Sequence, residues 1–128
     1  DMAIYNFLFN IHNGLPINKY GTGETLRDYT YIDDIVTGIL GAIDCDKKCE
    51  VYNLGNDQVT SLNKLIEYCE EAVGKKAIIN NMGMQLGDVE ITYADTKKAR
   101  IDLGYNPQNS DIKESIKKTY DLLKENVL

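Results

Sequence analysis

Short β-favouring segments alternate with amphipathic helices along this chain, and the alternation limits how it can fold. Apolar spacing and helix-end signals predict helices over 2–13, 33–43, 62–73, 95–104 and 111–123. Runs of β-favouring residues predict strands over 17–20, 51–54 and 77–80. Alternation of the two kinds is typical of an α/β layer structure. We therefore expect a small sheet with helices, which depends on strands from outside the chain.

Two of the predicted helices carry signals at their ends. Ser61 stands where its hydroxyl can cap the first turn of the third helix, and Gly74 stops that helix. Asp111 and Glu114 form an acidic version of a capping box at the start of the last helix. In that helix, Tyr120 belongs to the face that we expect to point inward.

The second predicted helix combines an apolar stripe with two glycines. Ile35, Ile39 and Ile43 fall on one face, and we expect this face to be buried. Gly38 and Gly41 lower the helix propensity of the same segment. Their presence indicates that neighbouring elements approach the helix closely.

The composition excludes several classes of function. With 128 residues and 14.4 kDa, the chain is one compact domain or part of a larger one. Its formal net charge is -6, which argues against a nucleic-acid partner, because such binding depends on clustered cations. Three cysteines without a CxxC pair and the single His12 provide no Cys/His zinc set, so we predict no metal site.

Targeting signals are missing from the sequence as given. No stretch approaches the ~20 apolar residues of a membrane span, and no basic and then apolar leader precedes the first helix. We therefore predict a soluble, cytoplasmic protein without a membrane partner. Residue 1 is Asp and not an initiator Met, so we expect the chain to be part of a longer natural protein.

Few residues suit catalysis. The Gly-Thr-Gly run at 21–23 looks like half of a dinucleotide-binding loop, but a β-like segment follows it where a helix is required. Two Tyr-x-x-x-Lys spacings, Tyr93 with Lys97 and Tyr120 with Lys124, would pair a phenol with an ammonium on one helical face. Because Tyr93 precedes its helix and Tyr120 belongs to an apolar face, we favour structural roles for both.

Arg27 is one of only two arginines and lies where a glycine-containing loop meets a β-like segment. From such a position, its planar guanidinium can bind a phosphate through two hydrogen bonds. The alternative is a structural ion pair with Asp28, Asp33 or Asp34. The residue pattern alone leaves both roles open.

Asp88 follows Gly87 in a segment that we expect to be a loop. A carboxylate in such a loop can accept hydrogen bonds from the two hydroxyls of a ribose. Asp after Gly is also common as turn chemistry, which is the simpler interpretation of these two residues taken alone.

Several separated motifs, in their expected order, resemble one enzyme family. They are DMA at 1–3, PINKY at 16–20, RDYTYIDDI at 27–35, YNLGN at 52–56, MQLGDV at 84–89 and TYAD at 92–95. The chain resembles the C-terminal part of an extended short-chain dehydrogenase/reductase, among the NAD-dependent nucleotide-sugar epimerases and dehydratases. The similarity is closest to the UDP-glucuronate 4-epimerase branch and spans nearly the whole chain.

The resemblance implies that two domains of the protein have different functions. In this family an N-terminal Rossmann domain binds NAD and carries the residues that move the C4 proton and hydride, while the C-terminal part binds the nucleotide. Residues 1–128 would then be the nucleotide-sugar-binding portion of a larger, homodimeric enzyme that converts UDP-glucuronate to UDP-galacturonate. With the Rossmann half missing, the chain alone would be inactive.

The same resemblance implies roles for four residues. Arg27 would bind the diphosphate, Asp88 the ribose hydroxyls, and Tyr20 would lie beside the uracil, although it also fits a half-buried strand aromatic. Gln85 stands where related galactose epimerases carry a second diphosphate-binding Arg, and it would contribute a hydrogen bond without a charge. Two alternatives stay open: part of a nucleotide-sugar 4,6-dehydratase, and a non-catalytic α/β binding module.

Overall fold

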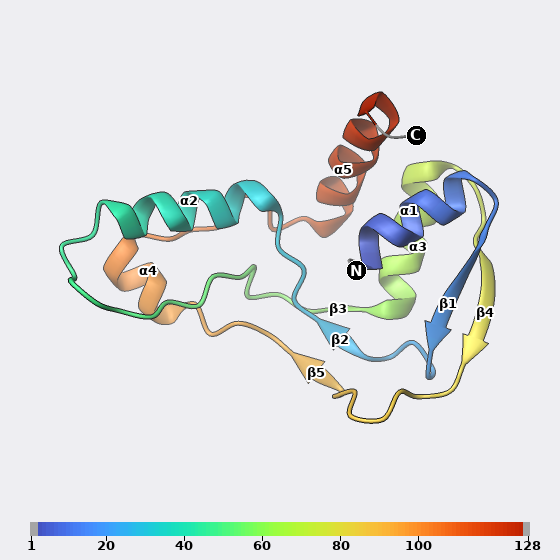
Figure 1. Ribbon diagram of the computed structural model, residues 1–128, viewed down its shortest axis with the longest axis horizontal. Helices are drawn as coiled ribbons and strands as arrows, with labels where there is room; N and C mark the ends of the chain where they lie inside the picture. The colour runs from blue at the N-terminus through green and yellow to red at the C-terminus, as the bar shows by residue number, and fades with distance from the viewer. Residues whose placement is uncertain (1–2, 127–128) are drawn as a thin grey trace.

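The computed structural model describes residues 3–126, which form five helices and five short strands (Figure 1). The helices are α1 Ala3–His12, α2 Ile32–Ile43, α3 Leu62–Val73, α4 Lys97–Leu103 and α5 Ile112–Asn126. The strands are β1 Pro16–Tyr20, β2 Leu26–Arg27, β3 Thr60–Ser61, β4 Ile78–Met82 and β5 Ile91–Thr92. The expected α/β class is confirmed, and the molecule narrows from a wide lobe to an arm.

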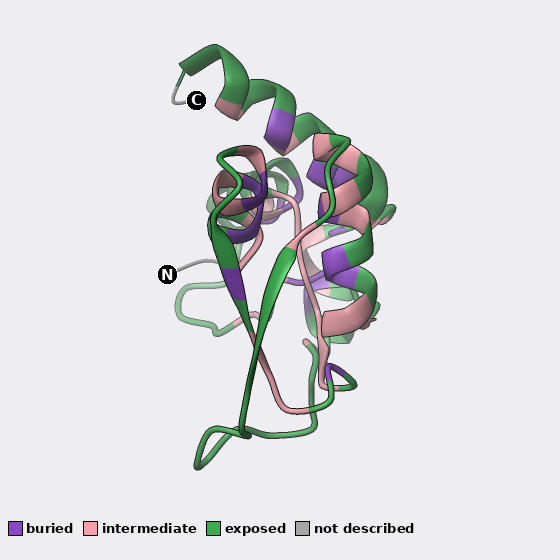
Figure 2. Cartoon of the chain, turned by 90° about the vertical axis from the view of Figure 1, so that its right-hand side faces the viewer, coloured by how far each residue is buried: buried purple, intermediate pink, exposed green. Residues whose placement is uncertain are grey.

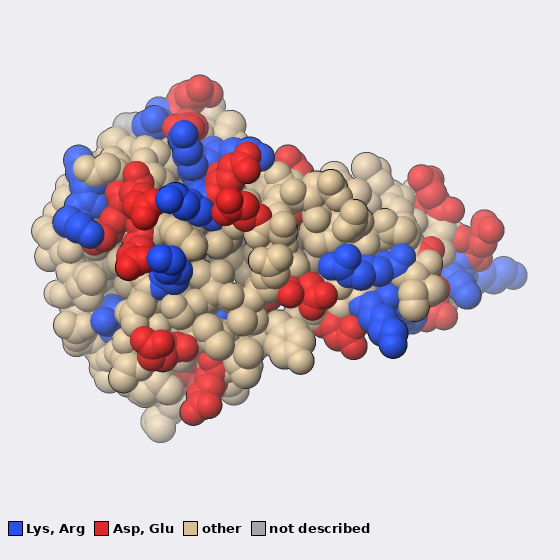
Figure 3. Space-filling view, turned by 180° about the vertical axis from the view of Figure 1, so that it is seen from behind, with Lys and Arg blue, Asp and Glu red and all other residues tan. Residues whose placement is uncertain are grey.

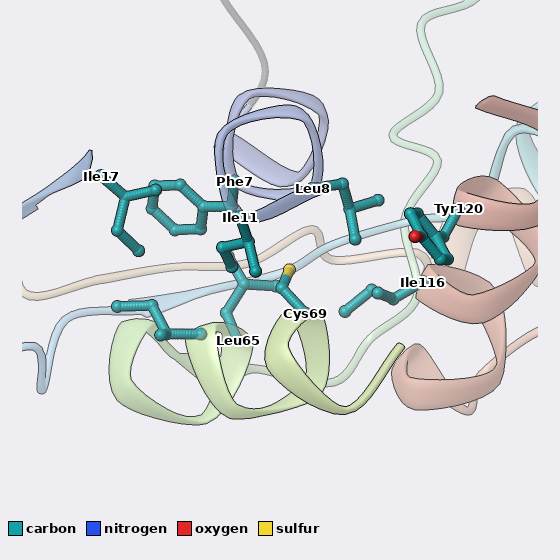
Figure 4. Close-up of a cluster of buried hydrophobic side chains, with 9 residues drawn as sticks. Phe7, Leu8, Ile11, Ile17, Leu65, Cys69, Ile116 and Tyr120 are labelled. Atoms are coloured by element: carbon teal, nitrogen blue, oxygen red, sulfur yellow. The ribbon is translucent and has the colours of Figure 1, made fainter. Parts of the chain in front are cut away.

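The lobe consists of α1, α3, α5, β1 and β4 and contains the hydrophobic core. Helix α3 packs against both α1 and α5, and α1 also contacts β1. Apolar side chains from these three helices and from β1 point into one cluster (Figure 4). Its buried members are Phe7, Leu8, Ile11, Ile17, Leu65, Ile66, Cys69, Ile116 and Tyr120.

The ends of α3 and α5 follow the sequence signals. The Ser61 hydroxyl accepts a hydrogen bond from the Lys64 amide, and Gly74 ends α3 in the left-handed conformation at φ 74°. The Asp111 carboxylate accepts hydrogen bonds from two amides in the first turn of α5. Each polar group satisfies backbone groups that a helix end leaves without partners.

The strands form two small sheets. In the first, β1 pairs with β4 in parallel, with Ile17 opposite Ile79. In the second, β2 is the central strand, antiparallel to β3 and parallel to β5. Figure 2 shows how little of the first sheet is covered, since one residue of β1 and none of β4 is buried. The predicted strands at 17–20 and 77–80 are confirmed within a few residues.

The arm contains α2, α4 and the segments that join them to the rest of the chain. The prediction of a buried stripe on α2 is wrong, because Ile39 and Ile43 are 49% and 73% exposed and Ile35 is only partly buried. Helix α2 contacts α4 over a small area near its C-terminal end. Among residues 3–126, most of the large apolar side chains of α2 therefore stay exposed.

The glycines of α2 mark close contacts, as predicted. A Cβ at Gly38 would come within 2.6 Å of the Leu54 side chain, and one at Gly41 within 3.0 Å of the Leu103 carbonyl. Any larger residue would therefore push the neighbouring segment away from α2.

The predicted strand at 51–54 is wrong, since this segment has no regular secondary structure. A strand needs a partner for its backbone groups, and no strand of the described chain lies against this one. The β-like run that begins at Asp28 has no regular secondary structure before α2 begins. Pairing occurs just before it, at Leu26 and Arg27.

Two carboxylates join segments of the arm to one another. Asp34 is 3% exposed and accepts hydrogen bonds from the Gln108 amide at 2.8 Å and from the backbone and side chain of Asn109 at 3.0 and 3.1 Å. Asp28 accepts hydrogen bonds from the amides of Asn56 and Asp57 at 3.0 and 3.1 Å. Both side chains join segments that are distant in sequence.

The surface shows acidic and basic side chains interspersed over the wide lobe (Figure 3). Ion pairs on this lobe include Lys64 with Glu67 and Lys113 with Glu71. Between residues 3 and 126, no helix is both long enough and apolar enough to traverse a lipid bilayer.

Candidate functional site

Arg27 occupies the last position of β2, and its neighbours are set by the parallel pairing of β2 with β5. Leu26 lies opposite Ile91 and Arg27 opposite Thr92, while the Leu26 amide donates to the Glu90 carbonyl at 2.8 Å. This register brings the loop that precedes β5 alongside the Arg27 side chain. Nη1 of the guanidinium also donates to the Leu26 carbonyl at 2.8 Å.

Asp88 is presented by a tight turn in that loop. The Asp88 amide donates to the Gln85 carbonyl at 3.2 Å, and Gly87 has a φ of 85° between them. A positive φ at the third position of such a turn favours glycine, because a Cβ would be strained there. Gly87 therefore supports the turn, and the turn presents the Asp88 carboxylate.

The two side chains meet, although they are 61 residues apart in sequence. Nη2 of Arg27 forms an ion pair with Oδ1 of Asp88. The side chains are 26% and 28% exposed, so the pair is partly desolvated and still open to a ligand. The alternative partners Asp28, Asp33 and Asp34 do not fill this role, since no ion pair within the described chain joins Arg27 to any of them.

The ion pair lies in the wall of a cavity of about 720 Å³, a volume within the usual range for small-molecule sites. Tyr20 and Gln85 also line it. All four residues named from the sequence thus surround one space, although they come from β1, β2 and the loop before β5. Tyr20 is half-buried at the end of β1, as expected for a strand aromatic.

Helix α1 provides a wall of the cavity that the sequence analysis missed. Ala3, Asn6, Phe7 and Asn10 all line it. They recur at helical spacing and share one face of α1. The signal available in the sequence was a pair of asparagines on an otherwise apolar helical face.

Tyr29 closes another part of the wall, beyond β2. Burial raises the pKa of its phenol, while the nearby Arg27 guanidinium acts in the opposite direction. The hydroxyl therefore stays protonated at neutral pH and can donate a hydrogen bond.

Other groups that could have carried chemistry do not line this cavity. The Tyr120 hydroxyl hydrogen-bonds His12 Nδ1 at 2.8 Å, and the Lys124 ammonium lies 4.8 Å from the Tyr120 ring centre. Tyr93 is 63% exposed and precedes α4, which begins at Lys97. In residues 3–126 no group of three or more His, Cys, Asp or Glu is placed to bind a metal ion.

The Gly-Thr-Gly run at 21–23 does not fit NAD. A Cβ at Gly21 would come within 2.6 Å of the Met84 sulfur, and one at Gly23 within 2.1 Å of the Asn63 side chain. Both glycines are packed against protein, and β2 follows the run where a dinucleotide loop would open a helix. The residues of this loop therefore do not form a cradle for a dinucleotide.

The chain is similar to several known proteins. A family model described as GDP-mannose 4,6 dehydratase matches residues 1–119. A Methanocaldococcus jannaschii protein is 43% identical over 126 residues, or 98% of this chain and 38% of the relative. A UDP-glucuronate 4-epimerase of Thermodesulfobacterium geofontis is 38% identical over 128 residues, or 99% of this chain and 39% of the relative.

A solved structure agrees with these matches. The UDP-glucuronic acid 4-epimerase of Bacillus cereus, in complex with UDP-glucuronic acid and NAD, superposes with a TM-score of 0.89 at 31% identity. The match covers 98% of this chain and 40% of the Bacillus protein, so the chain spans about two fifths of the length of its relatives. The chain therefore belongs to the family of NAD-dependent nucleotide-sugar epimerases and dehydratases.

Proposed function

We propose that residues 1–128 are the C-terminal, nucleotide-binding portion of a two-domain, NAD-dependent enzyme that epimerises C4 of a UDP-sugar, with UDP-glucuronate as the favoured substrate. The single observation that carries this proposal is the convergence of Arg27 and Asp88 on one cavity. The UDP-glucuronate 4-epimerases among its relatives support the substrate.

Arg27 has the chemistry to bind the diphosphate. In the structure its guanidinium is paired with the Asp88 carboxylate, so it already binds an anionic oxygen. A bound diphosphate would replace that contact with charge-assisted hydrogen bonds of its own. Since the guanidinium is already partly buried, such bonds are stronger than they would be in water.

Asp88, released from Arg27, would accept hydrogen bonds from the ribose hydroxyls. Tyr20 lines the same cavity and offers a flat apolar face to a base, as the resemblance implied. Gln85 begins the turn that holds Asp88, and its side-chain amide is an uncharged hydrogen-bond donor. These four contacts would fix the nucleotide and leave the sugar outside them.

This role is positioning and not catalysis. Binding energy from a remote part of a substrate can hold the reacting part in place. The nucleotide end would be held here, while the sugar turns against residues of the partner domain. In this proposal the parent enzyme is a cytoplasmic homodimer, and residues 1–128 alone are inactive.

Calorimetric titration of the full-length protein with UDP tests the proposal. Arg27→Ala should weaken binding by about 2 kcal/mol, or about 30-fold, because a charged double contact is lost. Arg100→Ala is the matched control, since it removes the same charge from a residue that contacts Thr96 and Asp57 outside the cavity. Equal UDP affinity in both variants would contradict the role of Arg27.

A 4,6-dehydratase is the second candidate, because the matching family model is described as GDP-mannose 4,6 dehydratase. The two activities share the oxidation at C4 and differ in their products. Incubation of the full-length protein with UDP-glucose and UDP-glucuronate, followed by NMR of the products, separates them. A C4 epimer supports the first candidate, and a 4-keto-6-deoxy sugar supports the second.

A further inference from the structure

We propose that Asn6 and Asn10 of α1 bind the hydrogen-bonding edge of the nucleobase and so set the base specificity of the cavity. This inference rests on the proposed function and adds the residues that would select the base. The observation behind it is that Arg27 and Asp88 line the cavity from β2 and from the loop before β5, while α1 lines it with two neutral amides.

The two asparagines lie on one face of α1, four residues apart. Phe7 shares that face, lines the cavity and also belongs to the buried core, where Figure 4 shows it next to Ile17 of β1. The helix is thus anchored through Phe7, and its two amides are held at the cavity wall. Asn6 is exposed and Asn10 is half-buried.

The hydrogen bonds already present leave a defined set of free groups. Asn10 donates from Nδ2 to the Pro16 carbonyl at 3.2 Å, which leaves Oδ1 as an acceptor. For Asn6, no side-chain hydrogen bond is formed with any residue between 3 and 126. Asn6 can therefore offer both a donor and an acceptor to a ligand.

This set matches the edge of a neutral base and not a phosphate. A pyrimidinedione presents an N3–H donor beside two carbonyl acceptors. The acceptor of Asn10 suits N3–H, and the donor of Asn6 suits the adjacent carbonyl oxygen. Side-chain amides carry no charge, so they would add little to the binding of the diphosphate, which Arg27 serves.

Titrations of the full-length protein with UDP, 3-methyl-UDP and inorganic pyrophosphate test the inference. The methyl group of 3-methyl-UDP removes the N3–H donor, and pyrophosphate lacks a base. The wild-type protein should bind UDP about 10-fold more tightly than 3-methyl-UDP. Asn6→Leu and Asn10→Leu should each weaken UDP by about 10-fold, reduce that preference, and leave pyrophosphate affinity unchanged.

Asn81→Leu is the matched control, because Asn81 is exposed on β4 and does not line the cavity. It should bind all three probes as the wild type does. If the Asn6 and Asn10 variants lose all three probes equally, or keep the full preference for UDP over 3-methyl-UDP, the inference is overturned while the proposed function stands. A wild-type protein that does not bind UDP at all would overturn both.

Discussion

The lobe and the arm of this molecule are stabilised by different interactions. In the lobe, α3 buries Leu65, Ile66 and Cys69 against its neighbours. In the arm, α2 buries only Asp34 and Gly38, although its sequence is the more apolar of the two. Composition alone therefore does not decide which helix becomes part of a core; the neighbours available to it do.

What the arm lacks in apolar packing, it partly replaces with polar contacts. The buried hydroxyl of Tyr105 donates to the Gly55 carbonyl at 2.8 Å, and the Tyr52 hydroxyl donates to the Asp102 carboxylate at 3.2 Å. Such bonds orient segments well, but each contributes only about 1 kcal/mol to stability. The lobe is therefore stabilised by burial and the arm by a small number of specific hydrogen bonds.

Substitutions in the core of the lobe should change the free energy of unfolding the most. Leu65→Ala should lower the free energy of unfolding by about 3 to 4 kcal/mol, because it leaves a cavity at a fully buried position. Ile39→Ala on the exposed face of α2 should change it by about 0.5 kcal/mol or less. Denaturant unfolding of both variants measures the difference, and equal losses would remove the distinction between lobe and arm.

Substitution of Asp34, the buried carboxylate of the arm, should have the next largest effect, on local opening of the chain. Asp34→Ala removes three hydrogen bonds, and we expect local opening of the segment around Gln108 and Asn109 to become easier by about 2 kcal/mol. Hydrogen exchange should then accelerate about 30-fold at the Gln108 and Asn109 amides and remain unchanged in α3. Asp33→Ala is the control, since Asp33 is exposed. Faster exchange throughout α3 would show that the arm and the lobe unfold together.

A smaller change in stability should come from raising the pH, through the Cys69 thiol in the core of the lobe. Burial raises the pKa of the Cys69 thiol from its ordinary value of 9.0 to about 12. Below pH 9.0 the thiol is protonated in both the folded and the unfolded chain, so its contribution to stability is complete. As the pH rises further, the unfolded chain loses the proton first, and stability falls until the pH passes about 12.

We expect this loss to be on the order of 1 kcal/mol by about pH 10. Denaturant unfolding at about pH 8 and about pH 10 should show it in the wild type and less of it in Cys69→Ala. Cys49→Ala should behave as the wild type does, because Cys49 is exposed. Identical pH dependence in all three proteins would mean that Cys69 is not desolvated.

The sequence predicted the long elements better than the short ones. The helices over 62–73 and 111–123 were predictable because their caps and their apolar spacing agree. Strands β2, β3 and β5 are two residues long, too short to show any periodicity. The exposed face of α2 was not predictable, because burial depends on what lies against a helix and not on the helix itself.

The site was predictable in part. Roles for Arg27 and Asp88 were predicted from residue chemistry together with the family resemblance, and the two side chains line one cavity. Their direct ion pair depends on the parallel pairing of β2 with β5, which no local pattern indicates. Asn6 and Asn10 were missed because a pair of asparagines on an apolar helical face does not by itself indicate a ligand.

The structure of the full-length protein with bound UDP would show directly whether Arg27 and Asp88 bind one nucleotide. We expect diphosphate oxygens within hydrogen-bond distance of the Arg27 guanidinium and ribose hydroxyls on the Asp88 carboxylate, with the ion pair between the two side chains opened. UDP bound at a different surface, with Arg27 and Asp88 still paired to each other, would contradict this prediction.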